Sequence, residues 1–261
     1  MRIDQERINK MVKDLGEKYL KRFVKDIHIF GGENLKKLKD KSVLYLPNHL
    51  SHFDYIAIPK ILNNFELKHP FIIAGSNLNH WPTNKLFSEE TGAIFINRKV
   101  MEGDRINKRK KEEIIQLNSA LEELILNGEN LINFIESGRS YNKKIMERGS
   151  SGILRRYLKI SKKFEKEPYG CNIAIKYEPN TIESPCLKVT SFFKNKVEAI
   201  YLFTDLYAFG KDYFFGGENR PIVKINFGAP YPLKEFTGKK GHSKLLKFVQ
   251  EDVKRLYKKI S

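Results

Sequence analysis

The chain alternates short apolar runs with longer amphipathic stretches. The apolar runs predict strands at 42–46, 71–75, 92–97, 131–135, 172–177, 186–193, 197–203 and 222–227. Helical spacing of apolar residues predicts helices starting near residue 53 and over 79–90, 108–126, 153–164 and 243–260. No internal repeat, low-complexity tract or linker interrupts this pattern. Because strands alternate with helices, we predict one α/β domain whose mixed, largely parallel sheet is flanked by helices.

An amphipathic helix is predicted at the start of the chain, over residues 6–27. Its apolar stripe consists of Ile8, Met11, Val12, Leu15, Tyr19, Phe23 and Ile27. Two interpretations fit this stripe: it packs on the domain's own core, or it lies in a lipid interface with its lysines facing anionic headgroups. Gly31-Gly32 then ends the pattern. We therefore divide the chain into an N-terminal helical segment, 1–30, and an α/β domain, 31–261.

The charge of the chain is strongly positive. Among its 261 residues, 48 Lys and Arg stand against 31 Asp and Glu, which gives a net charge of +17. Such a surplus indicates an anionic partner: nucleic acid, an anionic membrane surface or a phosphorylated substrate. No recognition-helix motif or RNA-binding aromatic signature is present, so we expect no nucleic acid among the partners.

Hydropathy and cysteine usage point to the compartment. No run approaches the roughly 18 apolar residues that a membrane span requires. The charged first residues lack the apolar core of a signal peptide. Cys171 and Cys186 are the two cysteines, and their spacing does not match a metal site. We expect a cytoplasmic protein that associates peripherally with a membrane surface.

The most informative polar stretch is Pro47–Asp54, directly after the first predicted strand. His49 falls where this strand ends, and Ser51 and Asp54 form an S-x-x-D capping box at the start of the next helix. An imidazole beside a carboxylate is the arrangement of a general base that an acid orients. Two other interpretations stay open: Asp54 is only a helix cap, or His49, His52 and Asp54 bind a metal. The spacing H-x-x-H-x-D lacks the further ligands of a zinc site.

Polar residues also follow two other predicted strands. Arg98 comes directly after the third strand, and the run after the fourth contains Glu136, Gly138, Arg139 and Ser140. In open α/β sheets the ligand crevice lies at the carboxyl ends of the strands, so we expect these residues to converge on His49. Arginine suits a phosphate because its planar fork donates two parallel, charge-assisted hydrogen bonds. Glu136 can brace an arginine or the loop itself, and Gly138 allows the backbone to approach closely.

Three blocks resemble, in order and spacing, the first three blocks of the glycerolipid acyltransferase family: Asn48-His49-x4-Asp54, residues 92–98 and residues 134–140. That family includes glycerol-3-phosphate and lysophosphatidate acyltransferases. The resemblance implies that His49 is the catalytic base and that Asp54 orients it. It also implies that the acceptor's phosphate is held by Arg98, Glu136, Gly138 and Arg139. Ser137 replaces a glycine of the family pattern, and the strand at 172–175 lacks the proline of the fourth block, which leaves that block's functional residue unplaced.

The third block favours one branch of the family. Ile135 precedes Glu136, and Arg139-Ser140 follows Gly138, which is closer to the E-G-G-R-S form of glycerol-3-phosphate and dihydroxyacetone-phosphate acyltransferases than to P-E-G-T-R. The resemblance implies acyl transfer from a thioester, acyl-CoA or acyl carrier protein, to a phosphorylated glycerol acceptor. It implies no metal and no other cofactor. Lysophosphatidate is the alternative acceptor. We further predict that the backbone amides of residues 51–53 stabilise the oxyanion.

Overall fold

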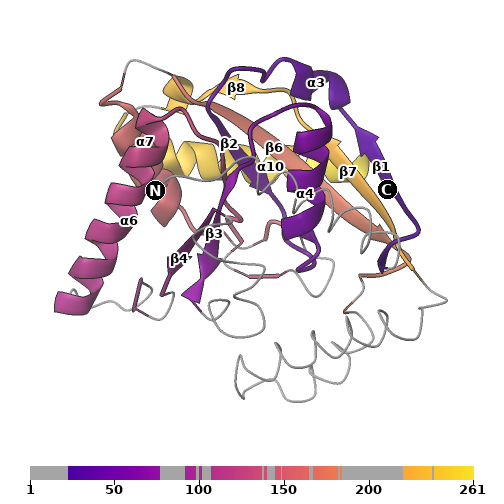
Figure 1. Ribbon diagram of the computed structural model, residues 1–261, viewed down its shortest axis with the longest axis horizontal. Helices are drawn as coiled ribbons and strands as arrows, with labels where there is room; N and C mark the ends of the chain where they lie inside the picture. Colours follow the sequence, from indigo (N-terminus) through magenta and orange to yellow (C-terminus); the bar gives the residue numbers. More distant parts are fainter. Residues whose placement is uncertain are drawn as a thin grey trace.

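One sheet organises the computed structural model, which describes residues 23–76, 92–97, 100–101, 107–136, 138–139, 145–147, 149–164, 167–181, 183, 220–236 and 238–261 (Figure 1). Its strands are β1 (Asp26–Phe30), β2 (Val43–Pro47), β3 (Phe71–Gly75), β4 (Ala93–Ile96), β5 (Leu131–Ile132), β6 (Tyr169–Glu178), β7 (Ile222–Phe227) and β8 (Tyr231–Pro232). The helices are α3 (Gly32–Lys36), α4 (Asp54–Asn64), α6 (Lys108–Leu126), α7 (Gly152–Ser161) and α10 (Gly241–Lys258), with the 3₁₀ helix η6 at Leu233–Phe236.

The strand order is β1-β7-β6-β2-β5-β3-β4, and β8 pairs with the start of β6. Strands β2 to β6 all run in one direction, as the parallel pairings of β2 with β5 and β6 and of β3 with β4 and β5 require. Strand β7 is antiparallel to β6, and β1 is parallel to β7. The predicted mixed, largely parallel sheet is confirmed. Strands β2, β4, β5 and β6 therefore share one carboxyl edge, where the candidate residues follow them.

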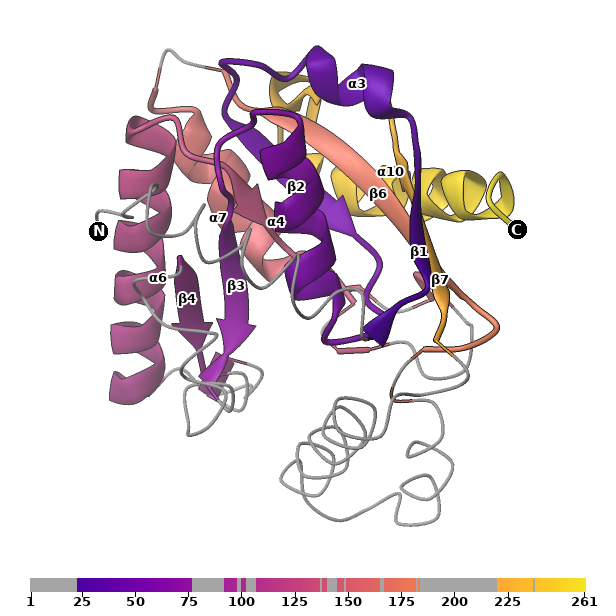
Figure 2. The same cartoon turned by 45° about the vertical axis from the view of Figure 1, so that its right-hand side comes forward.

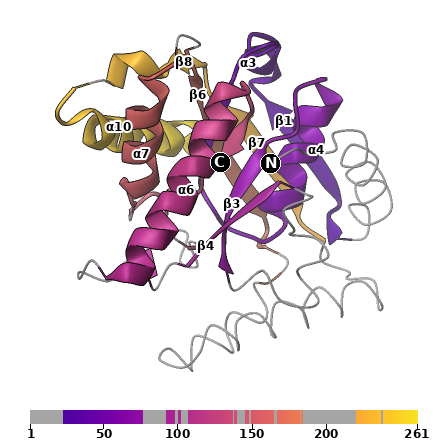
Figure 3. The ribbon, with the colours of Figure 1, turned by 60° about the vertical axis from the view of Figure 1, so that its left-hand side comes forward.

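Helices cover both faces of the sheet. Along β2, Val43 and Tyr45 face a core shared with α3 and α4, whereas Leu44 and Leu46 face a core shared with α6, α7 and α10. Figure 3 shows these two helical layers on opposite sides of the strands. All five residues of β2 are buried, because a parallel strand covered on both faces has no solvent side. This burial explains why β2 reads as an uninterrupted apolar run.

Strand β1 was not predicted. The periodicity extended a helix to residue 27, but the chain is a strand from Asp26 and pairs with β7 at one edge of the sheet (Figure 2). Residues 26–30, which the sequence placed in the N-terminal segment, therefore belong to the sheet. Four of the five β1 residues are exposed, although the strand contains Ile27, Ile29 and Phe30. Its start was assigned to the helix because Ile27 follows Phe23 at helical spacing. Gly31 follows with φ +70°, and a Cβ there would lie 2.1 Å from the Phe227 carbonyl oxygen.

Most other predicted elements are confirmed within a few residues. Strands 71–75 and 222–227 and helix 108–126 match as predicted, while β6 is longer than expected and β5 shorter. The predicted elements at 79–90, 186–193 and 197–203 lie outside the described residues, as does most of the N-terminal helix. Within the described part of the chain, no helix has both the length and the apolar character needed to cross a membrane.

Candidate active site

The loop that carries His49 begins at the end of β2, which side-chain hydrogen bonds of Asn48 attach to β6. Asn48, the residue after β2, is fully buried. Its Oδ1 accepts the Ile175 N–H at 2.7 Å, and its Nδ2 donates to the Ile175 carbonyl at 3.0 Å. The side chain thus continues the pairing of β2 with β6 for one more residue. Helix α4 begins at Asp54, so the chain between Asn48 and Asp54 is a short loop held at both ends.

His49 and Asp54 form the hydrogen-bonded pair that the sequence predicts. His49 Nδ1 lies 3.0 Å from Asp54 Oδ2, and both side chains are buried. The same Oδ2 accepts the N–H groups of Leu50 and Ser51, at 2.8 and 3.0 Å. The other oxygen, Oδ1, accepts the Tyr177 hydroxyl at 2.6 Å. Four hydrogen bonds therefore hold this carboxylate in one orientation, which is what an acid that orients an imidazole requires.

These bonds also assign the imidazole tautomer. A carboxylate is only an acceptor, so Nδ1 carries the proton and the lone pair of the neutral ring is on Nε2. The Tyr55 hydroxyl, 3.2 Å from Nε2, then donates to it. The Phe134 ring packs on the imidazole with a centroid distance of 4.3 Å. Nε2 is thus the nitrogen that can take a proton. Tyr177 was not predicted; burial and, after it, the charge of Asp54 raise the pKa of its phenol.

The start of helix α4 differs from the prediction in the partner of Ser51 Oγ, and it contradicts the predicted oxyanion site. Ser51 N–H donates to Asp54 as a capping box requires, but Ser51 Oγ accepts from Phe53 N instead of Asp54 N. The N–H of His52 donates to Glu183 Oε1 at 2.8 Å. All three amides of residues 51–53 therefore already have acceptors within the protein. The prediction that they form an oxyanion site is wrong.

Glu136 braces the loop. Its Oε2 accepts the His49 N–H at 2.8 Å, and its Oε1 accepts the Met146 N–H at 2.6 Å. Of the two roles open from the sequence, these contacts correspond to bracing a loop, here through the backbone N–H of His49. Gly138 follows on the same loop, and a Cβ there would meet no described atom within 4 Å.

Arg139 is joined to the loop that carries His49 through Glu183, a residue that the sequence did not predict. Its Nη1 lies 3.4 Å from Glu183 Oε1, and that oxygen also accepts the Ser51 hydroxyl at 2.9 Å. The Arg139 side chain is 6% exposed and that of Glu183 is 0% exposed. Glu183 follows the carboxyl end of β6, so its position after a fourth strand was the signal that could have identified it.

The structure thus brings five of the seven predicted site residues to one edge of the sheet: His49, Asp54, Glu136, Gly138 and Arg139. The other two, Arg98 and Ser140, lie outside the described residues. Their convergence on His49 stays a prediction. Among the described residues, no group of three or more His, Cys, Asp or Glu side chains is arranged to hold a metal ion.

Comparison with known proteins agrees with this arrangement. Residues 26–163, more than half of the chain, match the family described as Acyltransferase. The chain belongs to the acyltransferase family. The matched region contains the His49–Asp54 pair and the Glu136–Arg139 loop, and the predicted family membership is confirmed. Glu183 and all of β6 lie beyond it.

Two curated relatives of this acyltransferase chain are both named glycerol-3-phosphate acyltransferase. It is 34% identical over 128 residues to the glycerol-3-phosphate acyltransferase of Hamiltonella defensa subsp. Acyrthosiphon pisum (strain 5AT), and 33% identical over 123 residues to that of Haemophilus ducreyi (strain 35000HP / ATCC 700724). These matches cover 48% and 46% of this chain but only 15% and 14% of the relatives.

A solved structure shows the same fold. The 1-acyl-sn-glycerophosphate (LPA) acyltransferase PlsC from Thermotoga maritima superposes with a TM-score of 0.57 at 18% identity, over 100% of this chain and 83% of the other. At that identity the similarity concerns the architecture. The mixed sheet between two helical layers is therefore an acyltransferase fold.

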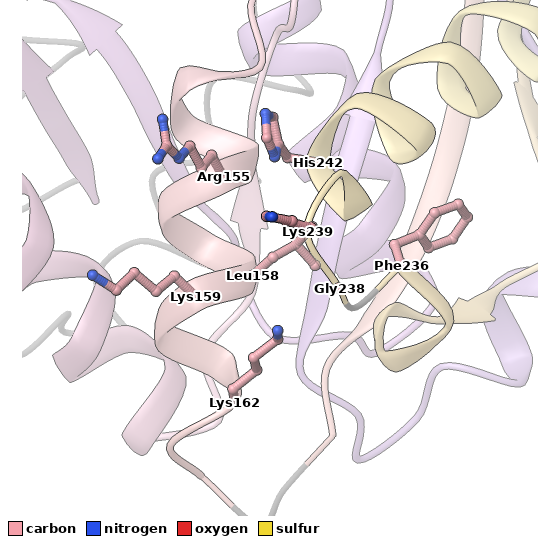
Figure 4. Close-up of a pocket in the computed structure, with 8 residues that line it drawn as sticks. All are labelled: Arg155, Leu158, Lys159, Lys162, Phe236, Gly238, Lys239 and His242. Carbon is pink, nitrogen blue, oxygen red and sulfur yellow. The ribbon is translucent and has the colours of Figure 1, made fainter.

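A separate basic pocket lies away from these residues (Figure 4). Its lining residues are Arg155, Leu158, Lys159, Lys162, Phe236, Gly238, Lys239 and His242. They come from α7 and the residue after it, from the end of η6, from the turn at 238–239 and from the start of α10. Because η6 follows β8, which pairs with the first residues of β6, this pocket lies toward the amino edge of the parallel strands. None of the predicted site residues lines it.

Proposed function

We propose that this chain is an O-acyltransferase of phospholipid biosynthesis. It moves a fatty acyl group from a thioester to a hydroxyl of a phosphorylated glycerol acceptor, with glycerol 3-phosphate as the favoured acceptor. The observation that carries the proposal is the buried hydrogen bond between His49 Nδ1 and Asp54 Oδ2, placed at the carboxyl edge of an acyltransferase fold. The names of the curated relatives support the choice of acceptor.

His49 acts as the general base at Nε2. The acceptor oxygen attacks the thioester carbonyl carbon while its proton passes to Nε2, and Asp54 stabilises the resulting imidazolium through Nδ1. When the tetrahedral intermediate collapses, the carbon–sulfur bond breaks and the imidazolium returns the proton to the leaving thiolate. The products are an ester and a free thiol. The acceptor hydroxyl is itself the nucleophile, so no covalent acyl-enzyme is needed.

Tyr55 marks where the acceptor hydroxyl must bind. Its own hydroxyl lies 3.2 Å from Nε2, at the only lone pair of the ring. An acceptor hydroxyl that hydrogen-bonds Nε2 has to share or take over this position. We infer that Tyr55 moves aside when the acceptor binds, and that its ring then forms part of the wall around the reacting oxygen.

Arg139, with Arg98, holds the acceptor's phosphate. A phosphate bound at a fixed place beside the catalytic loop presents one hydroxyl to His49, and such orientation can supply a large part of a rate enhancement. The link from Arg139 through Glu183 to Ser51 and His52 supports this assignment, because it ties the guanidinium to the loop of the base. The acyl donor is acyl-CoA or acyl carrier protein. The product is released at an anionic membrane surface, which suits the net charge of +17.

A product assay tests the proposal. Purified protein is incubated in parallel reactions that each contain radiolabelled palmitoyl-CoA and one acceptor. The acceptors are glycerol 3-phosphate, dihydroxyacetone phosphate, lysophosphatidate and lysophosphatidylcholine. We expect a labelled ester with glycerol 3-phosphate that is absent from the His49→Ala variant. Faster acylation of lysophosphatidate would reject the favoured acceptor and keep the acyltransferase. No ester with any acceptor, from palmitoyl-CoA or from palmitoyl-acyl carrier protein, would reject the proposal.

A further inference from the structure

Glu183 is a buried carboxylate at which two loops from different strands meet. Its Oε1 accepts three donors: Ser51 Oγ at 2.9 Å, the His52 N–H at 2.8 Å and Arg139 Nη1 at 3.4 Å. Ser51 and His52 follow β2 and lie beside the base, whereas Arg139 follows β5. A single oxygen atom therefore connects the loop of the general base with the loop of the proposed phosphate-binding arginine.

The surroundings of Glu183 are unusual for a carboxylate. It has no exposed surface, and its second oxygen, Oε2, has no hydrogen-bond partner in the described structure. Burial raises the pKa of this carboxyl group, while the charges of Arg139 and His52 act in the opposite direction. A buried charge is costly unless it is paired and hydrogen-bonded. The three donors on Oε1 offset this cost, so the carboxylate has to stay where it can accept from them.

We propose that Glu183 is a positioning residue that directs the Arg139 guanidinium toward the acceptor's phosphate and fixes its distance from His49. This inference rests on the proposed function. Arg139 and His49 belong to separate loops, so their spacing depends on whatever links the loops. Glu183 is such a link, because the same oxygen contacts both sides. Misplacement of a substrate by about 1 Å can lower a rate about a hundredfold, so this spacing matters for catalysis.

The contact between Arg139 and Glu183 is compatible with phosphate binding. A guanidinium carries five N–H donors in a planar fork, and this contact involves one terminal nitrogen. The N···O distance of 3.4 Å is longer than the roughly 2.7–2.9 Å of a strong charge-assisted bond. Glu183 therefore contacts the group through one nitrogen at a long distance, which orients the guanidinium without engaging the whole fork.

The Glu183→Gln variant tests the proposal. Glutamine keeps an acceptor oxygen for Ser51 and His52 but removes the charge that attracts Arg139. We expect the KM for glycerol 3-phosphate, and its Kd by calorimetry, to rise about tenfold, as for loss of one oriented charge-assisted contact. The kcat at saturating acceptor should fall as well, because a displaced phosphate moves the acceptor hydroxyl away from His49, while the KM for palmitoyl-CoA should stay within about twofold. Turnover of glycerol, which has no phosphate, should not change. An unchanged or lower KM for glycerol 3-phosphate would overturn the proposal.

A double-mutant cycle separates positioning from general damage. In an Arg139→Gln background, Glu183→Gln should raise the KM for glycerol 3-phosphate no further, because its effect passes through Arg139. Additive effects would show that Glu183 acts elsewhere and would contradict the inference. Glu167→Gln is a matched control, since Glu167 pairs with Lys234 at 2.8 Å near the opposite edge of the sheet. This control should leave every kinetic constant unchanged.

A second variant, Glu183→Asp, and the activity of the wild type distinguish the remaining outcomes. Should Glu183→Gln fail to fold, Glu183→Asp keeps the charge but is one methylene too short to reach both loops, and it should show the same rise in KM. A Glu183→Asp enzyme with normal KM would overturn the inference. If the wild type transfers no acyl group to glycerol 3-phosphate, the proposed function fails. If the wild type is active and the cycle is additive, the positioning role alone fails.

Discussion

At the scale of single residues, the surroundings of Asp54 explain how the His49 imidazole is oriented. The carboxylate accepts Tyr177 on one oxygen, and His49 with two backbone N–H groups on the other. Each of these donors restricts the rotation of the Asp54 carboxylate. The orientation of the His49 imidazole, which is bound to that carboxylate, is therefore restricted too. The geometry leaves Nε2 as the proton acceptor before any substrate arrives.

The first prediction concerns this pair. His49→Ala should lower kcat/KM for acyl transfer by about 10²–10⁴, the usual contribution of general-base catalysis. Asp54→Asn should lower it by at least about tenfold, because an asparagine can hold the ring in the wrong tautomer. Both rates are measured with palmitoyl-CoA and glycerol 3-phosphate, and urea unfolding of each variant is the control. A near-normal rate for a folded His49→Ala enzyme would exclude His49 as the base.

The second prediction concerns Glu183 and pH. Burial raises its pKa in the folded protein, so the native state binds a proton more tightly than the unfolded chain does. This group's contribution to stability is therefore fully present below the unfolded pKa and is lost as pH rises through the folded pKa. The free energy of unfolding of wild type, relative to that of Glu183→Gln, should therefore fall as pH rises above about 4.3, the ordinary pKa of a glutamate. Urea titrations at several pH values measure it. A difference that is constant or rises with pH would contradict the assignment.

At the scale of elements, the junction between β2 and α4 depends on a side chain that imitates backbone. Asn48 pairs with both the N–H and the carbonyl of Ile175, so β2 stays attached to β6 beyond its last strand residue. Glu136 then holds the next amide, that of His49. The catalytic loop thus leaves the sheet at one defined point.

Substitutions of Asn48 test this junction. Asn48→Ala leaves two buried backbone groups of Ile175 without partners, at about 1–3 kcal/mol each. We expect Asn48→Asp to be at least as destabilising, because its carboxylate cannot donate to the Ile175 carbonyl. Urea unfolding at pH 7 measures both variants. Asn34→Ala is a comparison, since Asn34 donates one bond to a backbone carbonyl, that of Phe227 at 3.0 Å, and its other side-chain bond is an exposed one from Lys37. A smaller loss for Asn48→Ala than for Asn34→Ala would refute the role of Asn48.

At the scale of the whole molecule, the sheet separates two cores and gathers the candidate site at one edge. The core of α3 and α4 also contains Tyr177 and Phe134, which contact the His49–Asp54 pair. Partly buried Phe23 and Ile27, the last two residues of the predicted N-terminal stripe, pack against the same core. The end of that segment is therefore anchored to the domain, and the role of residues 1–22 stays a prediction.

Removing residues 1–22 tests that role. Because β1 begins at Asp26, we expect the truncated chain to keep its sheet and its urea unfolding midpoint. Its binding to vesicles of phosphatidylcholine with phosphatidylglycerol should weaken by at least about tenfold, since each surface Lys or Arg contributes about 1 kcal/mol at an anionic membrane. Pure phosphatidylcholine vesicles and added salt are the controls. Unchanged vesicle binding, or loss of the fold, would favour packing of this segment on the core.

The sequence by itself determined the local features of this protein. His49 and Asp54 are five residues apart, so one strand end and one helix start suffice to bring them together, and both are visible in the apolar pattern. The sheet was equally predictable because strands buried on both faces, such as β2 and β3, are continuous apolar runs. Strand β1 was missed because Ile27, its second residue, also continues the helical spacing of the N-terminal stripe.

Only the tertiary structure decided which distant groups complete the site. Tyr177 and Glu183 bond to Asp54 and Ser51 across 123 and 132 residues, and Asn48 bonds to Ile175 across 127. These contacts exist because β6 lies beside β2, and that order depends on the packing of all the helices on both faces. Spacing along the chain contains no information about such neighbours. The same packing brought Glu183 to the His52 amide, whereas the acceptors of the Ser51 and Phe53 amides, Asp54 and Ser51, are local.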